Sequence, residues 1–131
     1  MTQNRDLLLT LREDIKRLVA KYSPEELDVF DEMFDNIVSE ADTIFECGEK
    51  ILDSENTLGF FGSGILTLAI TILITEIIRT FIRHSMKISA EGIRKIARRI
   101  LGKATAELSD KEVEEIANEL ARILAKLKLS S

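Results

Sequence analysis

The feature that most constrains this chain is a run of twenty uncharged residues, 56–75, near the middle of its 131 residues. A helix of roughly twenty apolar residues is long enough to cross the hydrocarbon layer of a membrane, which is about 30 Å thick. In water, the same run has to be covered by other protein. We expect one copy of so short a chain to have too little other material for this, which predicts burial in lipid or between copies of an assembly.

Apolar residues at steps of three and four predict amphipathic helices on both sides of this run. The amino-terminal part, 1–56, is expected to hold helices over about 6–22 and 24–53. The segment 57–88 is expected to form the apolar helix, with a membrane span over about 57–78. The carboxyl-terminal part, 89–131, is expected to hold helices over 90–101 and 110–129. The predicted fold class is therefore all-α with five helices, one of them apolar all round.

Serine residues mark three of the expected helix starts. Ser23 stands three residues before Glu26, and Ser109 stands three residues before Glu112, which is the pattern of a capping box. Ser89 is the expected N-cap of the helix over 90–101. A strand is the alternative within the apolar run, because Leu or Ile occupies every even position from 66 to 74. No second strand-like run is present in the sequence to pair with it.

The predicted helix over 24–53 carries the most regular apolar seam, which is of the coiled-coil kind. At 1.5 Å per residue, a helix of roughly thirty residues is about 45 Å long, more than a compact domain of this size needs. We therefore expect a second copy to pack along the seam. The seam residues are Leu27, Phe30, Phe34, Ile37, Ala41, Ile44 and Ile51.

Small and hydroxyl side chains recur every four residues along the apolar run. In lipid, such a ladder lets helix backbones approach closely, which predicts self-association. Two alternatives stay open: the hydroxyls bond back to carbonyls of their own helix, or they line a polar pore. The ladder consists of Gly59, Ser63, Thr67, Thr71 and Thr75.

Charge is strongly segregated around the apolar run. Residues 24–55 carry twelve acidic side chains and one lysine, whereas residues 77–103 carry eight basic side chains and one acidic side chain. The positive-inside rule predicts that 79–131 is cytoplasmic, with the basic side chains on lipid headgroups. Contact with nucleic-acid phosphates is one alternative, and pairing of the two charged blocks with each other is another. The basic residues are Arg79, Arg83, Lys87, Arg94, Lys95, Arg98, Arg99 and Lys103.

Side chains that carry enzymatic chemistry are scarce. His84 is the single histidine and Cys47 the single cysteine, so one copy offers neither a catalytic triad nor a histidine-rich metal site. The glycine-rich stretch 59–64 is not followed by the lysine of a phosphate-binding loop. The acidic helix lacks the Glu-x-x-His pattern of di-iron bundles. We expect no catalytic, cofactor or metal site and no small-molecule substrate.

These expectations describe a non-enzymatic, self-associating, membrane-embedded helical protein with a structural or pore-forming role. The alternative is a soluble intracellular or virion-type assembly subunit, of the capsid or nucleoprotein kind, which buries the apolar helix between copies. In that alternative, residues 79–103 contact nucleic acid. The expected partners are therefore further copies of the chain together with membrane lipid, or together with nucleic acid.

Overall fold

The computed structural model describes residues 2–53, 64–105 and 107–127, and it contains helices and no β-strand over these ranges. The all-α prediction is confirmed. The strand alternative for 66–74 is wrong, because those residues lie inside one helix. The described helices are α1 (Thr2–Thr10), α2 (Arg12–Tyr22), α3 (Leu27–Ser39), α4 (Ala41–Cys47), α6 (Ile65–His84), α7 (Ala90–Ala104) and α8 (Asp110–Lys126), with the 3-10 segments η1 (Pro24–Glu26) and η2 (Gly48–Asp53).

The predicted number of five helices is wrong, because both amino-terminal helices are divided and the described ranges hold seven α-helices. α1 and α2 are separated at Leu11, whose φ of −92° and ψ of 0° lie in the bridge region. α3 and α4 are separated at Glu40, with φ of −105° and ψ of 20°. Just before it, the Ser39 hydroxyl donates to the carbonyl oxygen of Asn36 at 2.7 Å, a bond of the kind that bends helices. The predicted long helix over 24–53 is therefore a bent series of shorter pieces.

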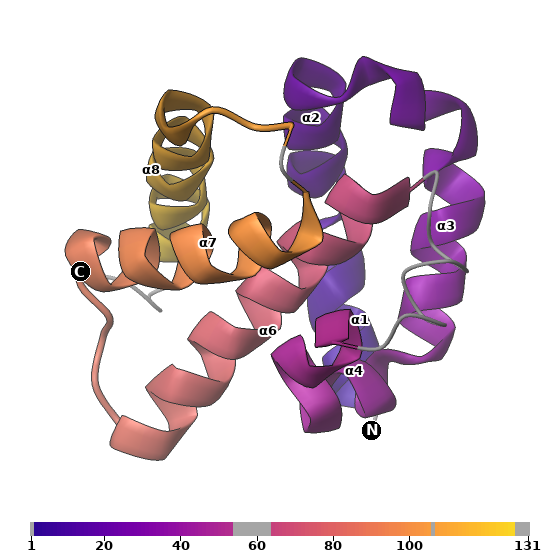
Figure 1. Ribbon diagram of the computed structural model, residues 1–131. Helices are drawn as coiled ribbons and strands as arrows, with labels where there is room; N and C mark the ends of the chain where they lie inside the picture. The colour runs from indigo at the N-terminus through magenta and orange to yellow at the C-terminus, as the bar shows by residue number, and fades with distance from the viewer. Residues whose placement is uncertain (1, 54–63, 106, 128–131) are drawn as a thin grey trace.

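Helix α6 crosses the middle of the molecule, as Figure 1 shows. It packs against α2, α3, α4 and η2 on one side and against α7 on the other. α8 covers α7 and also contacts α2. The bends between α3, α4 and η2 matter for this arrangement, because a straight helix would run along α6 on one line and leave more of it uncovered.

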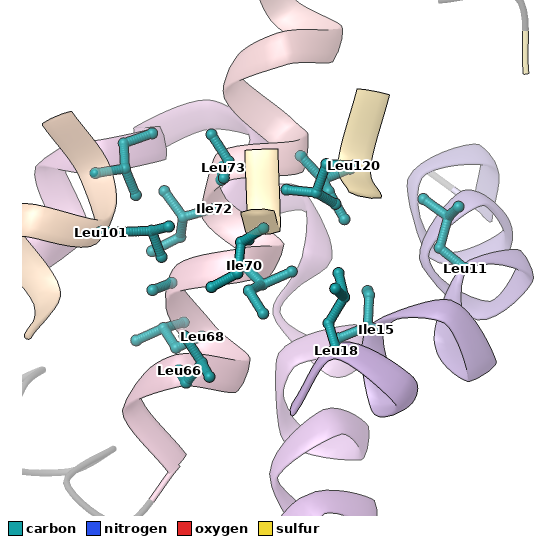
Figure 2. Close-up of a cluster of buried hydrophobic side chains, with 14 of the residues drawn as sticks. Leu11, Ile15, Leu18, Leu66, Leu68, Ile70, Ile72, Leu73, Leu101 and Leu120 are labelled. Carbon is teal, nitrogen blue, oxygen red and sulfur yellow. The ribbon is translucent and has the colours of Figure 1, made fainter. Parts of the chain in front are cut away.

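The apolar helix is buried within one copy of the chain. Twelve of its residues, all of 66–75 together with Ile77 and Ile78, are buried. Figure 2 shows Leu101 of α7 on one side of α6 and Ile15 and Leu18 of α2 on the other. Each fully buried Leu or Ile contributes about 1.5–3 kcal/mol relative to an exposed one. The expectation that one copy has too little material to cover this helix is therefore wrong for the described conformation.

Candidate functional site

The amino-terminal end of α6 is capped by a carboxylate from a distant part of the chain. Glu26 lies in η1 and is only 4% exposed. Its Oε2 accepts from the backbone N–H of Leu66 at 3.0 Å, and its Oε1 accepts from the N–H of Thr67 at 3.1 Å and from the Thr67 hydroxyl at 3.0 Å. The residue at the N-cap position, Gly64, has no side chain to do this. A carboxylate also suits the partial positive charge of a helix amino terminus.

This arrangement replaces the capping box that the sequence predicts at Ser23 and Glu26. The Ser23 side chain caps no backbone N–H of η1. Instead, its hydroxyl donates to Glu25 at 2.8 Å and to Glu26 at 3.0 Å. The capping-box prediction at this position is therefore wrong. The sequence analysis did not predict the role of Glu26. The one signal for it in the sequence is that the apolar run has glycine at position 64, which cannot supply an N-cap side chain.

The hydroxyls of the ladder bond within the chain. Thr67, Thr71 and Thr75 are fully buried. The Thr71 hydroxyl donates to the Thr67 carbonyl oxygen at 2.8 Å, and the Thr75 hydroxyl donates to that of Ile72 at 2.8 Å. In this conformation the three threonines leave no surface for a second copy, so self-association through them stays a prediction. Gly59 and Ser63 lie outside the described residues.

The predicted seam faces the chain's own core. Phe30 and Phe34 stack with ring centroids 5.5 Å apart and are fully buried. Leu27 is 38% exposed and Ile51 is half-buried. Pairing of this seam with a second copy would require another conformation, and it stays a prediction. The remaining seam residues, Ile37, Ala41 and Ile44, are buried as well.

Half of the predicted basic residues form ion pairs. Arg99 pairs with Glu49 at 3.0 Å, and Lys103 pairs with Glu49 at 3.3 Å and with Asp53 at 3.2 Å, which ties α7 to η2. The hydrogen bonds to Asp53 and Glu49 raise the pKa of Lys103. Two further pairs lie within single helices: Arg79 with Glu76 at 2.8 Å, and Arg94 with Glu91 at 3.0 Å. Pairing of the acidic and basic blocks is thus present at η2 and α7.

The other four basic residues are exposed. Arg83, Lys87, Lys95 and Arg98 form no ion pair with any residue that the structure describes. They fall into two places: Arg83 and Lys87 at the carboxyl-terminal end of α6 and the turn after it, and Lys95 and Arg98 on the outer face of α7. The structure therefore divides the predicted basic stretch into a paired half and two free clusters.

The carboxyl-terminal end of α6 projects beyond the other helices, as Figure 1 shows at its lower left. Here Ile82 is 68% exposed and Met86 is 63% exposed. The residues around them are also exposed: Arg83 and His84 lie between the two, and Lys87 follows Met86. The helix ends at His84, and the next residue, Ser85, has a left-handed backbone with φ of 53°. We call the exposed residues 82–87 the α6 tip.

Opposite charges also lie on opposite sides of α6. Helix α3 carries Asp28, Asp31, Glu32 and Asp35, all exposed, and no basic residue. Helix α7 carries five basic residues and one acidic residue. Figure 1 shows α3 and α7 on different sides of the central helix. The net charges, four negative on α3 and four positive on α7, are complementary.

The described residues offer little for catalysis or metal binding. They contain no group of three or more His, Cys, Asp or Glu side chains placed to hold a metal ion. His84 is exposed at the α6 tip, and Cys47 is half-buried at the end of α4. Comparisons with protein-family models, curated proteins and solved structures give no match for this chain.

Proposed function

We propose that this chain is a non-enzymatic, membrane-associating helical protein that carries α6 inside a shell of amphipathic helices and can place it in lipid. The proposal rests on two properties of α6, its membrane-spanning length and composition and its burial inside the fold. Among the described residues it is the one helix that is long and apolar enough to cross a membrane, yet it is largely buried inside the fold. A shell that covers such a helix lets it reach a bilayer without aggregating.

The energetics of exchanging the core for lipid support this proposal. Lipid tails are about as apolar as Leu, so moving Leu and Ile side chains of α6 from protein to lipid costs little. Inside a bilayer, every backbone and hydroxyl donor has to be satisfied within the helix. The hydroxyls of Thr71 and Thr75 already donate to carbonyls of their own helix and would keep these bonds. These two hydroxyls therefore need no new partner when α6 enters lipid.

A span of about 57–78 would change the polar contacts at the two ends of α6, and its first residues, 57–63, lie outside the described ranges. At the amino-terminal end, the contact to be lost is the Glu26 cap. At the other end, Glu76 pairs with Arg79 within the same helix, and this pair can move with the helix into the headgroup region, whereas the bond that Glu76 accepts from the N–H of Glu49 would be lost. Residues 79–131 would stay on the cytoplasmic side, since they hold the basic clusters. Inserted copies would associate through the ladder to give a structural or pore-forming assembly.

Limited proteolysis of the full chain with and without anionic liposomes tests insertion. Insertion predicts a protected fragment that covers about 57–78 and appears only with liposomes, identified by mass spectrometry. Helix α8 should be cut in both samples, which controls for protease access. Identical fragment patterns in the two samples would refute the proposed insertion.

A second candidate function is an assembly subunit that docks head to tail through α3 and α7. The complementary charges of these helices favour it, because a contact between different faces repeats from copy to copy. Asp35→Lys and Arg98→Glu should each lower the oligomer mass in low salt, and a mixture of the two variants should form heterodimers. If both variants alone keep the wild-type mass, the charged faces are not the interface.

The same candidate includes contact with nucleic acid through the free cations of α7. Lys95→Gln with Arg98→Gln should then weaken binding to a short RNA or DNA and flatten its salt dependence. Equal binding of this variant and the wild type would exclude α7 as the nucleic-acid contact.

A further inference from the structure

The α6 tip concentrates exposed apolar side chains in one place. Four large hydrophobic residues are exposed among the described side chains, and the two most exposed, Ile82 and Met86, both lie in this tip. Ile82 lies in the last turn of α6 and Met86 lies just after its end, beside a hollow whose lining includes His84, Met86 and Lys87. Exposed apolar side chains that cluster on a projecting element mark a surface that meets another apolar phase.

The charged residues of the α6 tip and of the sequence on either side of it, 77–90, are all basic. Arg83 and Lys87 are exposed and unpaired among the described residues. From Ile77 to Ala90 the sequence contains no acidic residue. The acidic residues nearest in sequence, Glu76 and Glu91, are each paired with an arginine of their own helix. A partner of the tip therefore has to accept two bulky aliphatic side chains and offer negative charge around them.

An anionic membrane surface matches both requirements. Amphipathic segments at the interface bury their apolar side chains at the boundary of headgroups and acyl chains, while Lys and Arg meet the phosphates. Each such cation strengthens binding to an anionic surface about fivefold. A nucleic acid suits the tip less well, because its two most exposed side chains, Ile82 and Met86, are aliphatic and His84 supplies its one ring.

We propose that the α6 tip, formed by Ile82, Arg83, Met86 and Lys87, docks the folded protein on anionic lipid bilayers. This inference rests on the proposed membrane function for the identity of the partner, and it adds the first step. Docking uses side chains that are already exposed, so it requires no opening of the shell. It also brings the carboxyl-terminal end of α6 to the headgroups first. The positive-inside rule keeps this same end on the cytoplasmic side after insertion.

Co-sedimentation of the full chain with vesicles tests the docking step. The vesicles are phosphatidylcholine alone or phosphatidylcholine with about 30% phosphatidylserine, a composition that gives a negative surface potential. Wild type should bind the mixed vesicles and bind neutral ones at least about 10-fold more weakly. Arg83→Gln with Lys87→Gln should weaken binding to the mixed vesicles by roughly 10- to 30-fold. Ile82→Ser with Met86→Ser should weaken it by about 10-fold or more.

Matched variants control for charge and for apolar area elsewhere. Lys95→Gln with Arg98→Gln removes the same amount of charge from α7. Leu9→Ser removes an apolar side chain of α1 that is 50% exposed. Both should change binding less than about twofold, apart from long-range electrostatics that salt screens. All the altered residues are exposed, so helix content and the urea midpoint should stay at the wild-type values.

Several outcomes overturn the docking proposal. They are failure of the wild type to bind mixed vesicles, equal binding to neutral vesicles, or a loss that follows the α7 variant instead of the tip variants. Tighter binding to a short RNA than to vesicles, lost in the tip variants, would assign the tip to nucleic acid instead. Tip-dependent binding without the protected fragment of 57–78 would refute insertion while docking stands. If the tip variants bind vesicles like the wild type and still give the protected fragment, docking through the tip is refuted and insertion stands.

Discussion

Replacing Glu26 by glutamine tests the link between η1 and α6. The carboxylate accepts from two backbone N–H groups and one hydroxyl, and it is 4% exposed. Glutamine keeps the shape but has one oxygen, so its NH₂ group would face either the N–H of Leu66 or that of Thr67. A buried donor left without an acceptor costs about 1–3 kcal/mol. Loss of the negative charge at the helix amino terminus adds about 0.3–1 kcal/mol.

The two contributions predict that Glu26→Gln lowers the free energy of unfolding by about 1.3–4 kcal/mol. With a urea dependence of about 2 kcal/mol per molar, the unfolding midpoint falls by about 0.7–2 M. Unfolding is followed by circular dichroism, since the chain contains no Trp. Glu25→Gln is the matched control, because Glu25 is the preceding residue, is exposed, and shares the Ser23 hydroxyl.

A Glu26→Gln midpoint equal to that of the wild type would refute the reasoning. It would mean that water or another side chain satisfies the amino terminus of α6, and that Glu26 does not hold η1 against it. A midpoint that falls for both variants alike would point to the loss of negative charge in this region instead of the loss of the cap.

Three further perturbations follow from single contacts. Gly48→Ala should lower stability by about 1–3 kcal/mol in urea unfolding, because Gly48 has φ of +60°, a backbone that side chains rarely adopt, and the new Cβ would displace the ends of Glu76 and Arg79. Thr71→Val should change stability by less than about 1 kcal/mol, whereas Thr71→Leu overfills a fully buried site and should cost about 1–3 kcal/mol; the reverse order would contradict this packing. Burial and the hydrogen bond to Glu115 raise the pKa of Tyr22 to about 12 from 10.0. The stability that Tyr22 adds is therefore complete below pH 10 and is lost as the pH rises through 12. Tyrosinate absorbance can follow this titration, because Tyr22 is the single tyrosine. The stability of Tyr22→Phe should depend less on pH over the same range.

Local signals in the sequence predicted the carboxyl-terminal half well. The Ser109 hydroxyl accepts from the N–H of Glu112 at 3.1 Å, and the Glu112 carboxylate accepts from the N–H of Ser109 at 3.0 Å, which confirms the predicted capping box. Ser89 caps α7 through the N–H of Gly92 at 3.1 Å, as expected. These interactions span three residues, so a single sequence contains all that they depend on.

The amino-terminal half was predicted less well, because its helix breaks depend on tertiary packing. The apolar spacing of 24–53 continues across Glu40, and neither a glycine nor a proline marks the change there. The bend lets Phe34 before it and Ile44 after it both reach the core. The spacing alone cannot distinguish a straight seam against a second copy from a bent seam around a central helix.

The Glu26 cap also connects stability to the proposed function. The apolar composition of α6 predicts that water is excluded from it, but does not indicate whether protein or lipid takes the place of water. The Glu26 cap distinguishes the two, because its hydrogen bonds to α6 are lost when 57–78 spans a membrane. A loss of about 1.3–4 kcal/mol from the covered form shifts the equilibrium toward an uncovered α6 by roughly 10- to 900-fold. If α6 enters lipid, Glu26→Gln should therefore increase the liposome-protected fragment relative to Glu25→Gln, at equal vesicle binding. A variant that is less stable in urea and yet gains no protected fragment would show that α6 is a core helix only.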